Sequence, residues 1–69
     1  MEYVVCIKNK DYKADLILHK IYKAIPDASL ETEDLRIIDE SGEDYIYPRS
    51  YFIPIEIPAE LKESFLVAA

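Results

Sequence analysis

The segment DLRIIDESGEDYIYPRSYFIPIEIP, residues 34–58, decides the fold of this chain. Two runs rich in β-branched and aromatic residues flank the dipeptide Ser41-Gly42. A third such run, FIPIEI, follows a break at Pro48. Runs of this composition, bounded by turn residues, are typical of β-strands. The segment therefore predicts a hairpin, a tight corner and one more strand, which together form the skeleton of a small β-barrel.

A two-residue loop in this hairpin would set the pairing of its strands. Strands are expected over residues 35–39 and 43–47, with Ile37 opposite Ile46. Gly42, the only glycine, supplies the positive φ that such a loop needs. Ile37 and Ile46 would then share one face of the hairpin. The other face would carry Arg36, Ile38, Tyr45 and Tyr47.

The residues before the hairpin are expected to supply two strands. Residues 2–7 alternate, with Val4 and Cys6 on one face. Residues 16–25, LILHKIYKAI, fit both helical and strand spacing, and their β-branched and aromatic content favours a strand over 20–25. The polar segments around this strand are expected to be loops: residues 8–15 and 27–34.

The residues after the hairpin are expected to form a turn, a strand and a helix. Residues 48–51 make the turn, and residues 52–57 make a strand that Pro54 restricts to a sheet edge or a bulge. Residues 58–69 are predicted to be a helix that Pro58 opens. Its apolar stripe is Leu61, Phe65, Leu66 and Ala68 or Ala69. A helix this short must pack on the open end of the barrel or on another chain.

Composition predicts one small domain over residues 1–69, with the barrel in 1–57 and the helix in 58–69. The chain is 51% hydrophobic, which is too apolar for a disordered segment. Its net charge of −6 argues against binding nucleic acid or an anionic membrane. No secretory leader or membrane-spanning run is expected. The single cysteine, Cys6, excludes an internal disulfide and a multi-cysteine zinc site, and favours a reducing, cytoplasmic setting.

The stretch YIYPRSYFIPIEI, residues 45–57, resembles the C-terminal end of Src-homology-3 domains. In that family the last long strand runs into a one-turn helix, opened by Pro and closed by Tyr, before a final short strand. LILHKIYKAI resembles the family's strand before its hairpin. The resemblance implies a mainly β fold, a small Src-homology-3-like (SH3-like) β-barrel of about five strands, here followed by a C-terminal α-helix. It also implies that Pro48 and Tyr51 help line a groove for proline-rich peptides, although this chain lacks the Trp that divides the family's groove.

The string LRIIDESGEDYIYP also resembles a group of short bacterial proteins that carry strings such as DESGEDYLYP. That group has no assigned activity, so this second resemblance implies none.

Two surface features are candidate binding sites. The hairpin carries four carboxylates, and the expected pairing places like charges opposite each other, which is unfavourable unless a cation or a basic partner binds there. A solvated turn is the alternative, and the spacing does not match a calcium loop. The four residues are Asp39, Glu40, Glu43 and Asp44.

The second feature is a predicted protein-binding face of Arg36, Tyr45, Tyr47, Pro48 and Tyr51, because tyrosine and arginine are frequent in interface hot spots. Core packing of the tyrosines is the alternative.

No catalytic constellation is predicted. His19 is the only histidine, Cys6 lies within a strand, and one glycine cannot make a phosphate-binding loop. We therefore expect no enzyme activity and no cofactor. The expected function is a non-catalytic module that binds a protein or peptide. The alternative is a structural or assembly protein that homo-oligomerises through its C-terminal helix.

Overall fold

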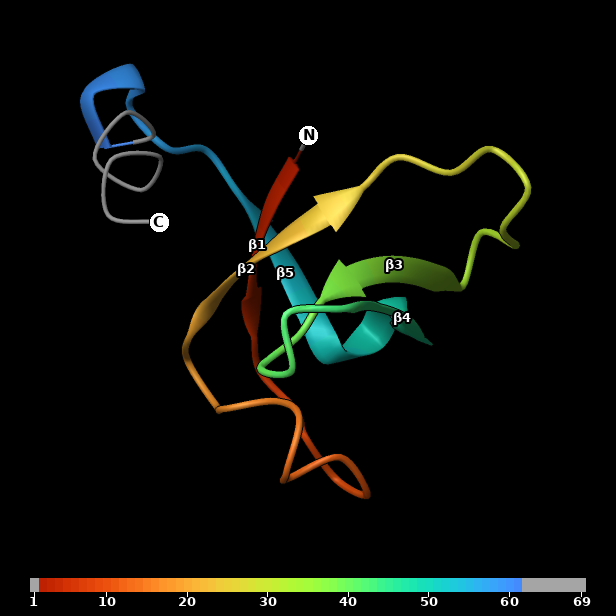
Figure 1. Cartoon of the computed structure of the whole chain (residues 1–69). Coiled ribbons are helices and arrows are strands. Elements are labelled where there is room, and N and C mark those ends of the chain that lie inside the picture. The colour runs from red at the N-terminus through yellow and green to blue at the C-terminus, as the bar shows by residue number, and fades with distance from the viewer. Residues whose placement is uncertain (1, 62–69) are drawn as a thin grey trace.

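Five antiparallel strands form one sheet in the computed structural model, which describes residues 2–61 (Figure 1). The strands are β1 (Glu2–Cys6), β2 (Ile21–Ile25), β3 (Asp34–Ile38), β4 (Asp44–Pro48) and β5 (Phe52–Ile55). Their order across the sheet is β4-β3-β2-β1-β5. A 3-10 turn, η1 (Arg49–Tyr51), joins β4 to β5. The predicted mainly β fold is confirmed, but the sheet is not closed, because β4 and β5 are its two edges.

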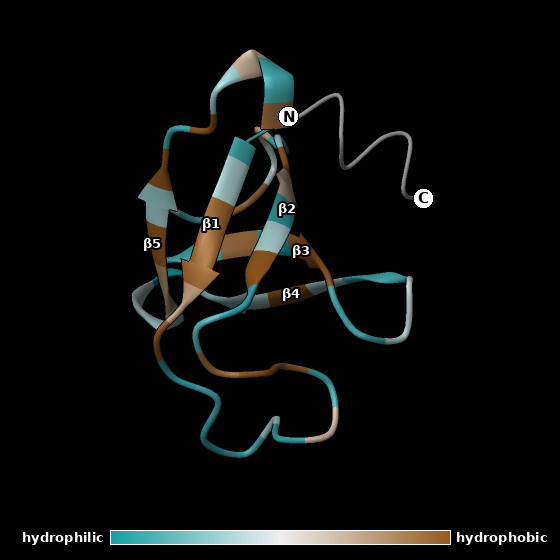
Figure 2. Ribbon diagram, turned by 90° about the vertical axis from the view of Figure 1, so that its left-hand side faces the viewer, coloured by the Kyte–Doolittle hydropathy of each residue, from teal (hydrophilic) through white to brown (hydrophobic). Residues whose placement is uncertain are grey.

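The sheet bends strongly around its core. Figure 2 shows β5, β1 and β2 running upright, with β3 and β4 crossing behind them. The side chains enclosed by this bend come from all five strands and from the loop between β1 and β2. The largest fully buried ones are Tyr47, Leu16, Ile37, Val4 and Cys6.

The ambiguous segment before the hairpin is a strand, as its composition favoured. In β2, Tyr22 and Ala24 are buried, whereas the side chains between and beside them are only half-buried. This alternation with a period of two is that of a strand with one face on the core. The predicted strand at the N-terminus is also confirmed, with Val4 and Cys6 on the buried face.

Pro54 lies in an edge strand, as predicted. Ile7 N donates to Tyr51 O at 2.8 Å, so these two residues are a hydrogen-bonded pair. Along an antiparallel ladder, every second pair of opposite residues is hydrogen-bonded. Pro54 lies opposite Val4, at a position between hydrogen-bonded pairs. Its missing N–H therefore faces away from β1, and the proline costs this ladder no hydrogen bond.

The hairpin pairs one residue out of the predicted register. Ile37 lies opposite Tyr45, not opposite Ile46. Because side chains alternate along a strand, a shift of one residue moves every side chain of β4 to the other face. Tyr47 is therefore buried, with 2% of its surface exposed, and Ile46 is 45% exposed.

The cause of this shift is a three-residue loop in place of the predicted two-residue loop. Asp39 N donates to Glu43 O at 3.1 Å, and Gly42 N donates to Asp39 O at 3.0 Å. Gly42 has a φ of +83°. A type I turn followed by a left-handed residue is the usual form of a three-residue hairpin loop. The carboxylate of Asp39 supports the turn by accepting a hydrogen bond from Ser41 N at 2.9 Å.

The helix predicted over residues 58–69 is described only at its start. Residues 59–61 form a helical turn, and Leu61 N donates to Pro58 O at 3.0 Å. Leu61 is 42% exposed. The rest of the predicted helix, with Phe65, Leu66 and the two alanines of its apolar stripe, lies outside the described residues.

Candidate functional site

The five residues predicted to form one binding face do not do so. Tyr47 is a core residue, and Arg36 projects from the opposite face of β3, because its neighbours Leu35 and Ile37 point into the core. Pro48 is half-buried and lies opposite Asp34. The prediction of a single exposed face is therefore wrong for Tyr47 and Arg36, and the cause is the shifted register of β4.

Three tyrosines near the end of the hairpin and one from the loop between β1 and β2 instead form a connected group, which we call the tyrosine cluster: Tyr12, Tyr45, Tyr47 and Tyr51. The ring of Tyr12 lies edge-on to Tyr47, with centroids 5.0 Å apart, and 6.0 Å from Tyr51. The Tyr45 and Tyr47 centroids are 6.2 Å apart. These separations lie within the range favourable for aromatic pairs. Tyr12 was not predicted as a site residue, and the only local signal was a single aromatic residue inside a polar loop.

Tyr47 holds the centre of the tyrosine cluster in place. Its hydroxyl donates to Asp39 Oδ2 at 2.7 Å, and Asp39 is only 6% exposed. Burial alone would raise the pKa of Asp39, but hydrogen bonds from Ser41 and Tyr47 outweigh it, so the pKa lies below its usual value. Burial raises the pKa of Tyr47, and the bond to Asp39 raises it further. Tyr47 therefore stays a protonated hydrogen-bond donor at neutral pH.

Tyr51 links the turn η1 to the loop between β1 and β2, residues 7–20, which we call the β1–β2 loop. Its carbonyl oxygen accepts hydrogen bonds from Ile7 N at 2.8 Å and from Lys8 N at 3.3 Å. Its hydroxyl donates to Lys10 O at 3.2 Å. Tyr51 is half-buried, so its ring supports this loop while one side remains accessible.

The acidic hairpin uses its carboxylates within the fold. Glu40 Oε2 accepts hydrogen bonds from Lys20 Nζ and from the Tyr22 hydroxyl, each at 2.6 Å. Asp44 pairs with Arg36 at 2.6 Å. The predicted pairs Glu40–Glu43 and Asp39–Asp44 are wrong, because Asp44 lies opposite Ile38 and Asp39 closes the loop with Glu43. Among residues 2–61, no group of three or more His, Cys, Asp or Glu side chains is placed to hold a metal ion.

Arg36 pairs with a second carboxylate, that of Asp27. Arg36 Nη2 lies 2.8 Å from Asp27 Oδ2. Hydrogen bonds from Ser29, together with Arg36, lower the pKa of Asp27 to about 2. Hydrogen bonds to Asp44 and Asp27 raise the pKa of Arg36. Arg36 thus joins the β2–β3 connection to β4, and its guanidinium pairs with two carboxylates of the same chain.

The backbones of Cys6 and His19 are hydrogen-bonded to each other, but their side chains do not form a reactive pair. Cys6 has no exposed surface, and burial raises the pKa of its thiol. Its Sγ donates to Lys8 O at 3.1 Å. His19 is exposed, and its backbone N donates to Cys6 O at 2.7 Å. The prediction that Cys6 is a core residue is confirmed.

No protein-family model, curated protein or solved structure matches this chain. Within the part of the chain that the structure describes, no helix is long and apolar enough to cross a membrane. Function is therefore inferred from the geometry of the described residues.

Proposed function

We propose that this protein is a non-catalytic interaction module that binds a protein or peptide through the tyrosine cluster. The observation that carries this proposal is the contrast between two neighbouring tyrosines of β4. Tyr45 is 64% exposed, and its ring lies against Tyr47, which is buried and hydrogen-bonded. An exposed aromatic ring on a fixed support offers a large contact area at a low cost in conformational entropy.

The surroundings of Tyr45 support the same proposal. β4 is an edge strand, so one side of its backbone has no strand partner among the described residues. An extended peptide can add to such an edge through main-chain hydrogen bonds. Pro48, at the end of β4, lacks an N–H and limits how far such pairing can extend. The site would therefore combine a short edge with the rings of Tyr45, Tyr12 and Tyr51.

We also infer that the fold is a Src-homology-3-like barrel left open. The strand order, the long β1–β2 loop, the β3–β4 hairpin and the one-turn helix between β4 and β5 support this inference. The resemblance implies a peptide groove that uses Pro48 and Tyr51, and Tyr12 lies where it can add an aromatic wall next to Tyr51. The cytoplasmic setting remains a prediction from the single cysteine.

The test is capture of a partner from the native host, followed by binding measurements on single variants. Tyr45→Ala and Tyr51→Ala should each weaken binding about tenfold, the size of effect expected for a moderate hot spot. Ile53→Ala is the matched control, because Ile53 is 50% exposed but lies on β5 at the other edge of the sheet. Melting curves must show that the variants remain folded. Equal binding by Tyr45→Ala and Ile53→Ala would contradict the proposal.

The alternative function, homo-oligomerisation through the C-terminal segment, remains a prediction. Of the apolar stripe, only Leu61 is among the described residues, and it is 42% exposed. Sedimentation of the full chain and of a chain lacking residues 58–69 tests this alternative. A full chain that stays monomeric at high concentration would rule it out.

A further inference from the structure

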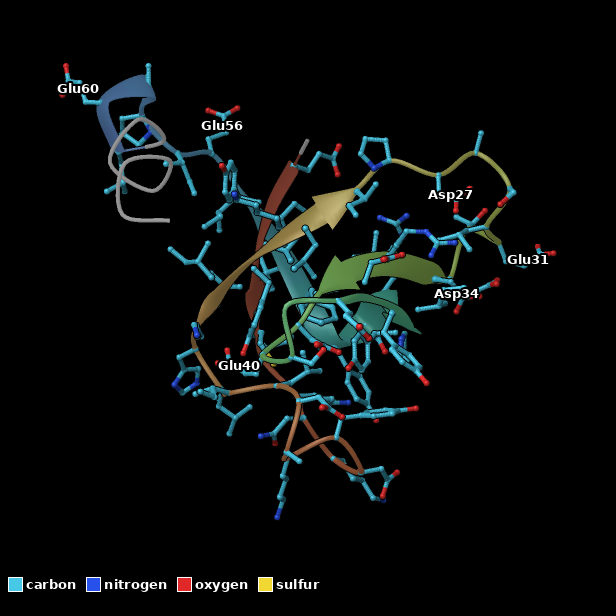
Figure 3. All side chains as sticks on the ribbon, in the orientation of Figure 1. Asp27, Glu31, Asp34, Glu40, Glu56 and Glu60 are labelled. Atoms are coloured by element: carbon cyan, nitrogen blue, oxygen red, sulfur yellow. The ribbon has the colours of Figure 1, made fainter. Side chains whose placement is uncertain are left out.

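Positive charge is concentrated in one part of this acidic chain. Residues 7–23 contain five lysines and two aspartates, a net charge of +3, although the whole chain carries −6. Residues 27–44 contain eight carboxylates and one arginine, a net charge of −7. Figure 3 shows Asp27, Glu31 and Asp34 around the connection between β2 and β3, away from the β1–β2 loop. The β2–β3 connection is therefore acidic, and the β1–β2 loop carries most of the positive charge. The hairpin supplies the other four carboxylates of residues 27–44, and one of them, Glu40, lies beside the β1–β2 loop and pairs with Lys20.

Four of these five lysines form no ion pair with a residue that the structure describes, and one of the four, Lys23, is half-buried in β2. Lys20 pairs with Glu40 at 2.6 Å. Lys8, Lys10 and Lys13 are exposed, and none of them forms an ion pair with a residue that the structure describes. Their charges are consequently available to a ligand.

The same three lysines surround a shallow hollow of about 450 Å³. Ile7, Leu18 and Tyr51 also line this hollow, and Ile7 and Leu18 are 39% and 45% exposed. Figure 2 shows the β1–β2 loop below the sheet, with a hydrophilic stretch followed by a hydrophobic one. Exposed apolar surface rimmed by charge often marks an interaction site. We call this feature the lysine hollow.

The backbone that carries the lysine hollow is held in one conformation. Leu16, fully buried, anchors the loop in the core, and Asn9 Nδ2 donates to Leu16 O at 3.0 Å. The backbone N–H groups of Ile7 and Lys8 both donate to Tyr51 O. A loop that is ordered before binding loses little conformational entropy when a ligand arrives. The hollow is therefore a preformed surface.

We propose that the lysine hollow binds an acidic segment of a partner protein. An apolar side chain of that segment would lie on Ile7 and Leu18, and flanking carboxylates would pair with Lys8, Lys10 and Lys13. This inference rests on the proposed function of a binding module and adds the chemical class of the partner. Charge complementarity selects the occupant, because a basic peptide would meet three like charges at this surface.

Two other occupants fit the observations less well. An anionic bilayer would attract the loop but repel the rest of a chain whose net charge is −6. A second copy would offer its own acidic β2–β3 connection, but it would also bring the same net negative charge. Both occupants are outcomes of the test, and either one would overturn the proposal.

The probe is a short fluorescent peptide in which one leucine is flanked by glutamates, with a lysine-for-glutamate peptide as its counterpart. The full chain should bind the acidic peptide and not the basic one, and binding should weaken as salt is added. Lys10→Glu and Lys13→Glu should each weaken binding about fivefold, as expected for loss of one exposed charge pair and its replacement by repulsion. Lys23→Glu is the matched control, because it changes the net charge equally but lies in β2, outside the hollow.

Equal loss in Lys10→Glu and Lys23→Glu would show that only the overall charge matters, and it would overturn the proposal. Binding to phosphatidylserine vesicles with none to the peptide would assign the hollow to lipid instead. Self-association that Lys10→Glu abolishes would assign it to a second copy. A captured partner that depends on Tyr45 but not on Lys10 would leave the proposed function standing and remove this inference alone, because Tyr45 does not line the hollow.

Discussion

Replacing Tyr47 by phenylalanine tests both the register of the hairpin and the support of the tyrosine cluster. The substitution removes one hydroxyl and keeps the ring in the core. That hydroxyl donates to Asp39 Oδ2 at 2.7 Å, and no other described residue donates to this oxygen. Both side chains are buried. A hydrogen bond to a charged group contributes about 1.5–3 kcal/mol, and Ser41 still satisfies the other carboxylate oxygen. We therefore expect Tyr47→Phe to lower the free energy of unfolding by about 2 kcal/mol.

Urea denaturation followed by circular dichroism measures this change. For a domain of this size a loss of about 2 kcal/mol lowers the urea midpoint by roughly 2 M and the melting temperature by roughly 8–16 °C. Tyr45→Phe is the matched control, because Tyr45 is 64% exposed and its hydroxyl bonds to no described residue. Its effect should stay within about 0.5 kcal/mol.

Ile46→Ala decides between the two possible registers. Ile46 is 45% exposed in the structure, so the substitution should cost less than about 1 kcal/mol. If β4 were paired as the two-residue loop predicted, Ile46 would be in the core and its truncation would cost about 2–5 kcal/mol. A strongly destabilised Ile46→Ala together with an unaffected Tyr47→Phe would refute the register and everything inferred from the burial of Tyr47.

Three further predictions concern single side chains. Gly42→Ala should destabilise the protein by about 1 kcal/mol in urea denaturation, because the φ of +83° is unfavourable for a side chain while the space for a Cβ is open. The pKa of Asp27 is lowered from 3.8 to about 2, so its contribution to stability should be complete above pH 3.8 and disappear as the pH falls toward 2; Asp27→Asn should flatten the pH dependence of the urea midpoint over that window. The thiol of Cys6 should react with Ellman's reagent only as fast as the protein opens, because it has no exposed surface and a raised pKa, and rapid reaction in the native state would contradict its burial.

The strands were predictable from the sequence because their patterns are local. Alternation and β-branched content placed β1, β2 and β5 within two residues of their observed bounds. Pro54 restricted β5 to an edge or a bulge, and β5 is an edge strand. The register of the hairpin was not predictable in the same way. It depends on whether the loop has two or three residues, and Asp39 decides this by turning its carboxylate back onto the loop. A buried carboxylate within an acidic run looks the same in the sequence as an exposed one.

The candidate site was harder to predict than the fold for a related reason. Tyr12 contacts Tyr47 and Tyr51 across a wide separation in sequence, and no local pattern indicates which loop will cover which strand. The lysines of the β1–β2 loop were counted only in the net charge of the whole chain. The net charge of −6 concealed the charge of +3 on residues 7–23, because it is a sum over the whole chain.

One buried carboxylate therefore affects both the stability and the surface of this protein. The hydrogen bonds of Asp39 fix the three-residue loop and hold the Tyr47 hydroxyl. Because side chains alternate along β4, the same register that buries Tyr47 presents Ile46 on one face and leaves Tyr45 exposed on the other. A change of one residue in the loop would take Tyr47 out of the core, so the ring beside Tyr45 would no longer be held by burial and by Asp39. The exposed ring that we propose as the binding site is in this way a consequence of how the turn is closed.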